Sequence, residues 1–141
     1  MRIVTIGLLV AVSVAACGPS GGRLFQTALP TTDHYPLPVE LRDGTGLVTG
    51  IEPAESEPQA AREPRVEADP TNPSAFIVSW LGGMCEGDAM LSFWRTDSTY
   101  TLFLAIRLAG TGCTALGVAR ALRVRTSSPI SADSIRVSSR N

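Results

Sequence analysis

Short apolar runs separated by turn residues fill the second half of the chain, and they restrict it to an all-β fold. Residues 74–81 (SAFIVSWL) are apolar on both faces, as in a central strand. Residues 89–96 and 100–108 flank a hairpin turn at 97–99. No segment has a convincing 3.6-residue period, and the best helical candidate, 114–122, is short and contains a glycine. Short strands at such intervals predict a small antiparallel β-sandwich of about seven strands.

Alternation of apolar and polar residues predicts the other strands. Apolar residues alternate with arginines along 120–126, which buries one side of that strand and exposes the other. A short edge strand closes the domain at 135–137, and a similar alternation runs along 37–42. Residues 47–52 are a further candidate strand, although the four turn residues before them leave its pairing open.

The first 17 residues have the composition of a leader. Arg2 gives a positive start, and the 14 residues of 3–16 are almost wholly apolar. They are too few to span a bilayer as a helix, which needs about 20. This pattern predicts a secretory signal peptide over 1–16. The alternatives are an uncleaved N-terminal membrane anchor and an ordinary secreted protein with a chance cysteine.

The end of the leader carries a more specific motif. Val14-Ala15-Ala16-Cys17 resembles the lipobox of bacterial lipoproteins. The resemblance implies that the Cys17 thiol is diacylglycerated, that the leader is cut before it, and that Cys17 becomes the first mature residue. The protein would then be held on the extracytoplasmic face of the cell membrane, where two or more acyl chains give a stable anchor.

Composition divides the mature chain into four parts. Gly-rich and Pro-interrupted polar residues after Cys17 predict a flexible tether. Five prolines and six acids between residues 51 and 73 cannot bury apolar area, so a solvated loop is expected there. The predicted parts are a lipid-anchored tether at 17–35, N-terminal strands at 36–52, a Pro/Glu-rich loop at 53–73 and a β-domain core at 74–141.

The charge balance excludes some functions. The chain has 12 Lys+Arg against 13 Asp+Glu, which does not suit a nucleic-acid binder. All the basic residues are arginines, so Schiff-base and P-loop lysine chemistry are impossible. Residues 17–73 hold four Arg and nine acids, a net charge of −5, and residues 74–141 hold seven Arg and four acids, a net charge of +3.

Two cysteines remain once Cys17 is assigned to lipid. Cys85 and Cys113 would lie outside the membrane, where disulfides persist, and only one pairing exists. They stand 13 and 15 residues from Ser98, so a bridge at the open end of the predicted hairpin is expected. Closing such a loop stabilises a protein by about 3.5 kcal/mol on the chain-entropy model. A redox-active or metal-binding pair is the alternative, although the spacing is not CxxC and the single histidine is distant.

Residues 74–138 resemble the small extracytoplasmic β-domains of uncharacterised actinobacterial proteins. The shared features are an apolar strand that ends in Trp-x-Gly-Gly-x-Cys, a hairpin, a second cysteine, Gly-Val-x-Arg and a Pro-Ile turn. In this chain they are found at 79–85, Cys113, 117–120 and 129–130, with a further match upstream at 43–48. The resemblance implies an extracytoplasmic β-fold. Its motifs are structural, so it implies no activity.

Candidate catalytic residues are few. The only histidine, His34, lies in the predicted tether, so no Ser-His-Asp or Cys-His site is expected. Glu86 and Asp88, in a Gly-flanked loop, are the best carboxylate pair. As acid and base they would make an envelope enzyme that acts on glycans, which is the alternative function. They also have the hard oxygens that Ca²⁺ prefers, without EF-hand spacing. Polar turn residues are the simpler interpretation, so we expect no enzyme activity, metal or cofactor.

Two sets of side chains are candidates for binding. Five arginines on neighbouring predicted strands form a possible basic face toward lipid headgroups, an anionic wall polymer or another envelope protein. They are Arg107, Arg120, Arg123, Arg125 and Arg136. The alternatives are a solvated sheet face, or a face that the acidic stretch 52–69 covers. Four aromatic residues are candidates for a sugar-binding platform, and they are Trp80, Phe93, Trp94 and Tyr100. Trp80 and Trp94 lie on different predicted strands beside apolar neighbours, which favours core packing.

These observations predict a non-catalytic binding or interaction module that is anchored by lipid to the cell envelope. A binder of small solutes is a weaker candidate, because a sandwich this small leaves little room for a pocket.

Overall fold

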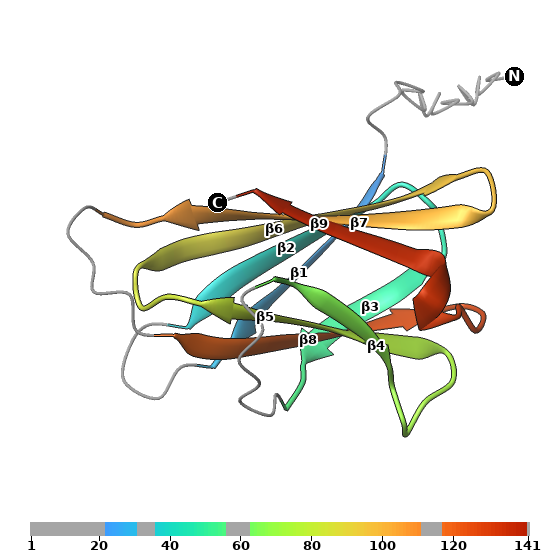
Figure 1. The fold of residues 1–141 in the computed structure, drawn as a ribbon, viewed down its shortest axis with the longest axis horizontal. Helices are drawn as coiled ribbons and strands as arrows, with labels where there is room; N and C mark the ends of the chain where they lie inside the picture. The colour runs from blue at the N-terminus through green and yellow to red at the C-terminus, as the bar shows by residue number, and fades with distance from the viewer. Residues whose placement is uncertain (1–21, 31–35, 56–62, 111–116, 141) are drawn as a thin grey trace, which may run out of the picture.

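The computed structural model describes residues 22–30, 36–55, 63–110 and 117–140, which form two sheets that pack face to face (Figure 1). Sheet A contains β1 (Arg23–Leu29), β2 (Leu37–Asp43), β6 (Glu86–Thr96), β7 (Thr99–Leu108) and β9 (Ile135–Arg140), in the order β1-β2-β6-β7-β9. Sheet B contains β3 (Val48–Pro53), β4 (Arg65–Ala68), β5 (Ala75–Gly82) and β8 (Val118–Thr126), in the order β3-β8-β5-β4. A single 3₁₀ turn, η1 (Ala132–Ser134), precedes β9.

The predicted all-β sandwich is confirmed, with nine strands among the described residues in place of about seven. Most strand pairs are antiparallel, but β2–β6 and β7–β9 are parallel. The chain leaves sheet A after β2, forms β3, β4 and β5 in sheet B, and returns to place β6 beside β2. Parallel neighbours need such a crossover. The expectation of a purely antiparallel sandwich is therefore wrong at these two pairs.

Strand β1 occupies residues that composition assigned to the flexible tether. It pairs with β2 along its whole length. Leu29 is buried and Phe25 packs against the core, so the segment buries apolar area that a flexible tether would leave in water. The tether prediction is wrong for 23–29, whereas 17–21 and 31–35 lie outside the described residues.

Strand β4 lies within the predicted Pro/Glu-rich loop. Its four residues pair with β5, and Val66 packs against the core while its neighbours Arg65, Glu67 and Ala68 stay exposed. One inward valine on an otherwise polar strand is a weak sequence signal, which explains why composition alone predicted a loop. The solvated-loop prediction is wrong for 65–68.

One buried carboxylate fixes the turn that follows β2. Asp43 accepts hydrogen bonds from the backbone N and the Oγ1 of Thr45, at 2.8 and 2.6 Å, and from the backbone N of Val48 at 3.0 Å. Gly46 has a φ of 74°, a conformation that favours glycine. This turn carries the chain from sheet A to sheet B, so β3 pairs with β8 and not with β2.

The core lies between the sheets and is built from alternate strand residues. In β6, Ala89, Leu91 and Phe93 are buried, and Met90 and Trp94 point out of sheet A. The core placement expected for Trp94 is therefore wrong, because it follows the inward Phe93 directly.

The predicted hairpin between β6 and β7 is confirmed. Thr96 is opposite Thr99, and the chain turns at Asp97, whose φ is 54°, and Ser98.

Within the described ranges, no helix is long and apolar enough to cross a membrane.

Candidate functional site

The structure separates the five arginines that the sequence grouped into one basic face. Arg107 and Arg136 lie in sheet A, and the other three lie in β8 of sheet B. Within β8, Arg123 and Arg125 point outward, whereas Arg120 is buried. The five side chains therefore do not form one binding face.

Arg120 forms an ion pair with Glu86 inside the sandwich. Its Nε lies 3.0 Å from the Oε2 of Glu86, and the two side chains are only 5% and 3% exposed. Arg120 is two residues before the buried Leu122, so the strand alternation already directs it inward. That alternation is the sequence signal that would have excluded Arg120 from the predicted basic face.

Gly82 makes room for the Glu86 carboxylate against the backbone of β5. A Cβ added at Gly82 would lie 2.3 Å from the Oε1 of Glu86 and 2.4 Å from its Oε2, which is closer than real Cβ contacts come. A glycine that reads in the sequence as the end of a strand is thus part of the geometry of the buried ion pair.

A bulge in β6 places Glu86 and Asp88 on opposite faces of sheet A. The register with β7 shifts between them, so that Glu86 is opposite Leu108 and Asp88 is opposite Arg107. Glu86 faces the interior, whereas Asp88 pairs with the exposed Arg107 on the outer face. The two carboxylates therefore do not meet in one cleft, as an acid and base acting on one glycosidic bond must.

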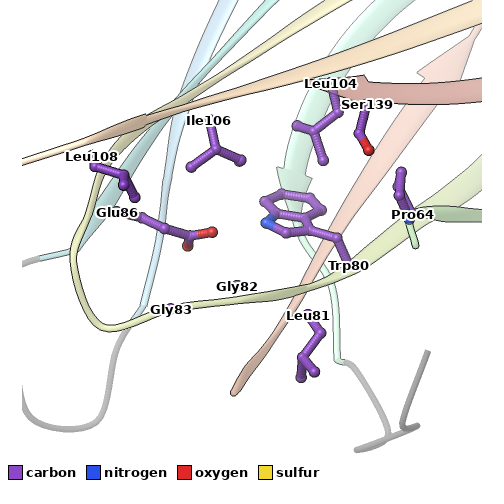
Figure 2. Close-up of a pocket in the computed structure, with 10 residues that line it drawn as sticks. All are labelled: Pro64, Trp80, Leu81, Gly82, Gly83, Glu86, Leu104, Ile106, Leu108 and Ser139. Atoms are coloured by element: carbon purple, nitrogen blue, oxygen red, sulfur yellow. The ribbon is translucent and has the colours of Figure 1, made fainter. Parts of the chain in front are cut away.

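A cavity of about 270 Å³ lies between the sheets beside the buried ion pair (Figure 2). Trp80 of β5 and Glu86 of β6 face it, and the side chains of Leu104, Ile106 and Leu108 line it from β7. The sequence led us to expect little room for a pocket in so small a sandwich. Gly82, the last residue of β5, and Gly83 are among the residues that line it.

The Trp80 Nε1 group is a buried donor that has no hydrogen-bond partner among the described residues. The residue is 5% exposed, so the core placement expected for Trp80 is confirmed. Figure 2 shows its indole nitrogen turned toward the side on which the Glu86 carboxylate lies. A buried polar group left unpaired costs about 1–3 kcal/mol, and most such groups find a partner. One polar group of a ligand in this cavity could hydrogen-bond to both the Trp80 donor and the Glu86 carboxylate.

A second polar cluster lies on the outer face of sheet B. The Nε of Arg123 lies 2.5 Å from the Oδ2 of Asp69, and its Nη1 lies 3.1 Å from the Oε1 of Glu52. The Nε of Arg125 lies 3.8 Å from the Oε2 of Glu52. Asp69 also accepts hydrogen bonds from the backbone N and the Oγ1 of Thr71. This agrees with the interpretation in which acids of the 52–69 stretch cover the arginines. The cluster therefore has little positive charge left for an anionic polymer.

The stability of the protein is expected to fall at acidic pH partly through Asp69. Hydrogen bonds from Thr71, and then the bond and charge of Arg123, hold the pKa of the Asp69 carboxyl below its ordinary value. A lowered pKa contributes stability that is present above the ordinary pKa and is lost as the pH falls through the folded-state pKa. Urea unfolding followed from pH 7 down to about pH 2 should show a smaller acid loss in Asp69→Asn than in the wild type. Equal losses in the two proteins would contradict this role.

The cysteine predictions fall largely outside the described residues. Cys17, His34 and Cys113 are among the residues that the structure does not describe. Cys85 lies between β5 and β6, and its carbonyl accepts a 2.8 Å hydrogen bond from the backbone N of Ala109. Ala109 follows β7 directly and stands four residues before Cys113. The pairing of Cys85 with Cys113 therefore stays a prediction.

Neither metal-ligating side chains nor comparisons with known proteins indicate a function. Across the residues with a described structure, no group of three or more His, Cys, Asp or Glu side chains is placed to hold a metal ion. Comparisons of the chain with protein-family models, with curated proteins and with solved structures give no match.

Proposed function

We propose that this protein is a lipid-anchored, non-catalytic binding module on the extracytoplasmic face of the cell membrane, and that the cavity beside Trp80 is its ligand site. The observation that carries the ligand site is the unpaired, buried Nε1–H of Trp80 in a cavity that it shares with the Glu86 carboxylate. Ligand pockets commonly combine apolar walls with a few convergent polar groups. The anchor is supported by the lipobox-like motif that ends at Cys17.

The state of the two acids favours binding over catalysis. Glu86 is held by Arg120 at 3.0 Å, and Asp88 lies on the opposite face of the sheet with its own arginine. General acid–base catalysis needs its groups within reach of one substrate. Among the described residues that line the cavity, Glu86 is the one carboxylate, and Arg120 offsets its charge, so its role is to accept a hydrogen bond.

The two polar groups together select a hydroxyl. An alcohol hydroxyl accepts a hydrogen bond from Trp80 Nε1 and donates one to the Glu86 carboxylate. That carboxylate has acceptor sites beyond the one that Arg120 uses. The volume of about 270 Å³ is just below the usual range for drug-sized ligands. The ligand is therefore a small apolar molecule that carries a hydroxyl, or one such group of a larger molecule.

Cyclohexanol is expected to bind more tightly than methylcyclohexane, which has a similar shape but no hydroxyl. Two hydrogen bonds, one of them to a charged group, should lower the Kd of cyclohexanol by roughly tenfold or more relative to methylcyclohexane. The shift of the melting temperature with each probe measures both affinities. Trp80→Phe keeps an aromatic wall but loses the N–H, so this variant should lose a large part of the preference.

Trp94→Phe is the matched control, since it makes the same change at a tryptophan on the outer face of sheet A. It should leave both affinities unchanged. Equal affinity of the wild type for the two probes, or a full preference for cyclohexanol in Trp80→Phe, would contradict the proposed ligand site.

A further inference from the structure

The outer face of sheet A carries an exposed apolar cluster. Leu24, Met90 and Trp94 are 50%, 47% and 38% exposed, and they are three of the five exposed large apolar side chains among the described residues. Each alternates with inward residues of β1 or β6, so all three point out of the same sheet. Apolar groups gathered on one exposed face often mark an interaction surface.

Three arginines lie around this cluster on the same face, and they are Arg42, Arg136 and Arg140. Arg42 is the register partner of Leu24, and β9 places the other two in line with Trp94 and Met90 across β7. The ion pairs found within the described part of the chain involve other arginines. We call Leu24, Arg42, Met90, Trp94, Arg136 and Arg140 the docking face.

The docking face has a net positive charge. Glu40 is the register partner of Met90 and is the acid beside it, so three arginines and one acid give a net charge of +2. The other acid that the described strands place on the outer face, Asp88, is already paired with Arg107. Excess positive charge around exposed apolar groups suits an anionic, partly apolar surface.

The chain enters sheet A beside Leu24, at the β1 edge of the docking face. Strand β1 begins at Arg23, directly before Leu24, and Cys17 is six residues earlier. Six extended residues span at most about 20 Å. Acyl chains on Cys17 would therefore hold the start of β1, and Leu24 with it, within about that distance of the bilayer.

We infer that the docking face lies against the anionic phospholipid surface of the membrane that holds the anchor. Arginines near such a surface strengthen binding by about fivefold each, and tryptophan is enriched at membrane–water interfaces. The inference rests on the lipid anchor of the proposed function and is independent of the proposed ligand site, which lies on the inner side of the sheet.

Quenching of Trp94 by brominated lipids tests the inference. The full acylated chain is reconstituted in phosphatidylcholine vesicles with brominated acyl chains, with and without phosphatidylglycerol. The quenching that disappears in Trp94→Phe belongs to Trp94. We expect strong quenching of Trp94 with phosphatidylglycerol and much less without it. Combining Arg136→Gln with Arg140→Gln should lower the docked-to-undocked ratio by about 25-fold. The charge-matched pair Arg65→Gln with Arg125→Gln, on sheet B, should leave it unchanged.

Two results would overturn the inference, and a third would overturn the proposed anchor. Trp94 quenching that is equal in both vesicles, or unchanged in the Arg136 and Arg140 variant, would overturn the inference. Trp94 that is unquenched in pure lipid but shielded in native membranes would assign the face to a protein partner, and would also overturn it. If mass spectrometry finds no acyl chain on Cys17, the proposed anchor fails. The unacylated chain is then co-sedimented with the same vesicles, where phosphatidylglycerol-dependent binding supports the docking face and no binding overturns it.

Discussion

Replacing Glu86 alone with leucine is expected to lower the free energy of unfolding by about 3–5 kcal/mol, because it leaves the buried Arg120 guanidinium without its counter-charge. Both side chains are 5% exposed or less, so bulk water solvates the unpaired guanidinium poorly. Arg120→Leu should lower the free energy of unfolding by a similar amount, because it leaves the buried Glu86 carboxylate without its counter-charge. Urea unfolding of the two single variants measures both values.

The double variant separates the cost of an unpaired charge from the value of the pair. Glu86→Leu combined with Arg120→Met removes both charges, and we expect a stability close to or above that of the wild type, because desolvation offsets most of the Coulombic gain of a buried pair. The exposed pair Asp88–Arg107 is the control, and its removal should cost less than about 1 kcal/mol. A cost of less than 1 kcal/mol for Glu86→Leu would show that the Arg120 charge is not buried in solution.

Loss of the predicted bridge between Cys85 and Cys113 is expected to lower the free energy of unfolding by about 3.5 kcal/mol, from the entropy of the loop that it closes. For a small domain whose total stability is about 5–10 kcal/mol, this is a large share. Chemical unfolding of Cys113→Ala, and of the wild type with and without reductant, measures the effect.

Non-additivity identifies the bridge as the cause. Cys85→Ala and the double variant should each lose as much stability as Cys113→Ala, because all three remove the same bond. Two titratable thiols in the oxidised wild type, or single-variant costs that add in the double variant, would contradict the pairing.

The strands that sequence reasoning predicted are those with several inward residues. β5, β6 and β7 bury several apolar residues each, and apolar runs bounded by turn residues show them clearly in the sequence. Strands β1 and β4 reach the core through few residues, such as Leu29 and Val66, and their flanking prolines and acids dominate the local composition. Their strand conformation depends on pairing with β2 and β5, the next strand in each case, which the composition of β1 and β4 alone does not reveal.

The candidate site depends on contacts that the sequence does not indicate. Arg120 and Glu86 are 34 residues apart, and a bulge reverses the facing of Glu86 relative to Asp88. These two acids were expected close together in a Gly-flanked loop, whereas both lie in β6 and its bulge places them on opposite faces of the sheet. The cavity follows from the same long-range packing, since β5 and β7 line it from different sheets.

The most direct test of the proposed ligand site is the ¹⁵N–¹H resonance of Trp80 Nε1 during a titration with cyclohexanol. We predict a downfield proton shift that saturates with ligand, no comparable shift with methylcyclohexane, and an unchanged indole resonance for Trp94. A Trp80 resonance that does not move, or that moves linearly without saturation as Trp94 does, would contradict a ligand hydroxyl bound between Trp80 and Glu86.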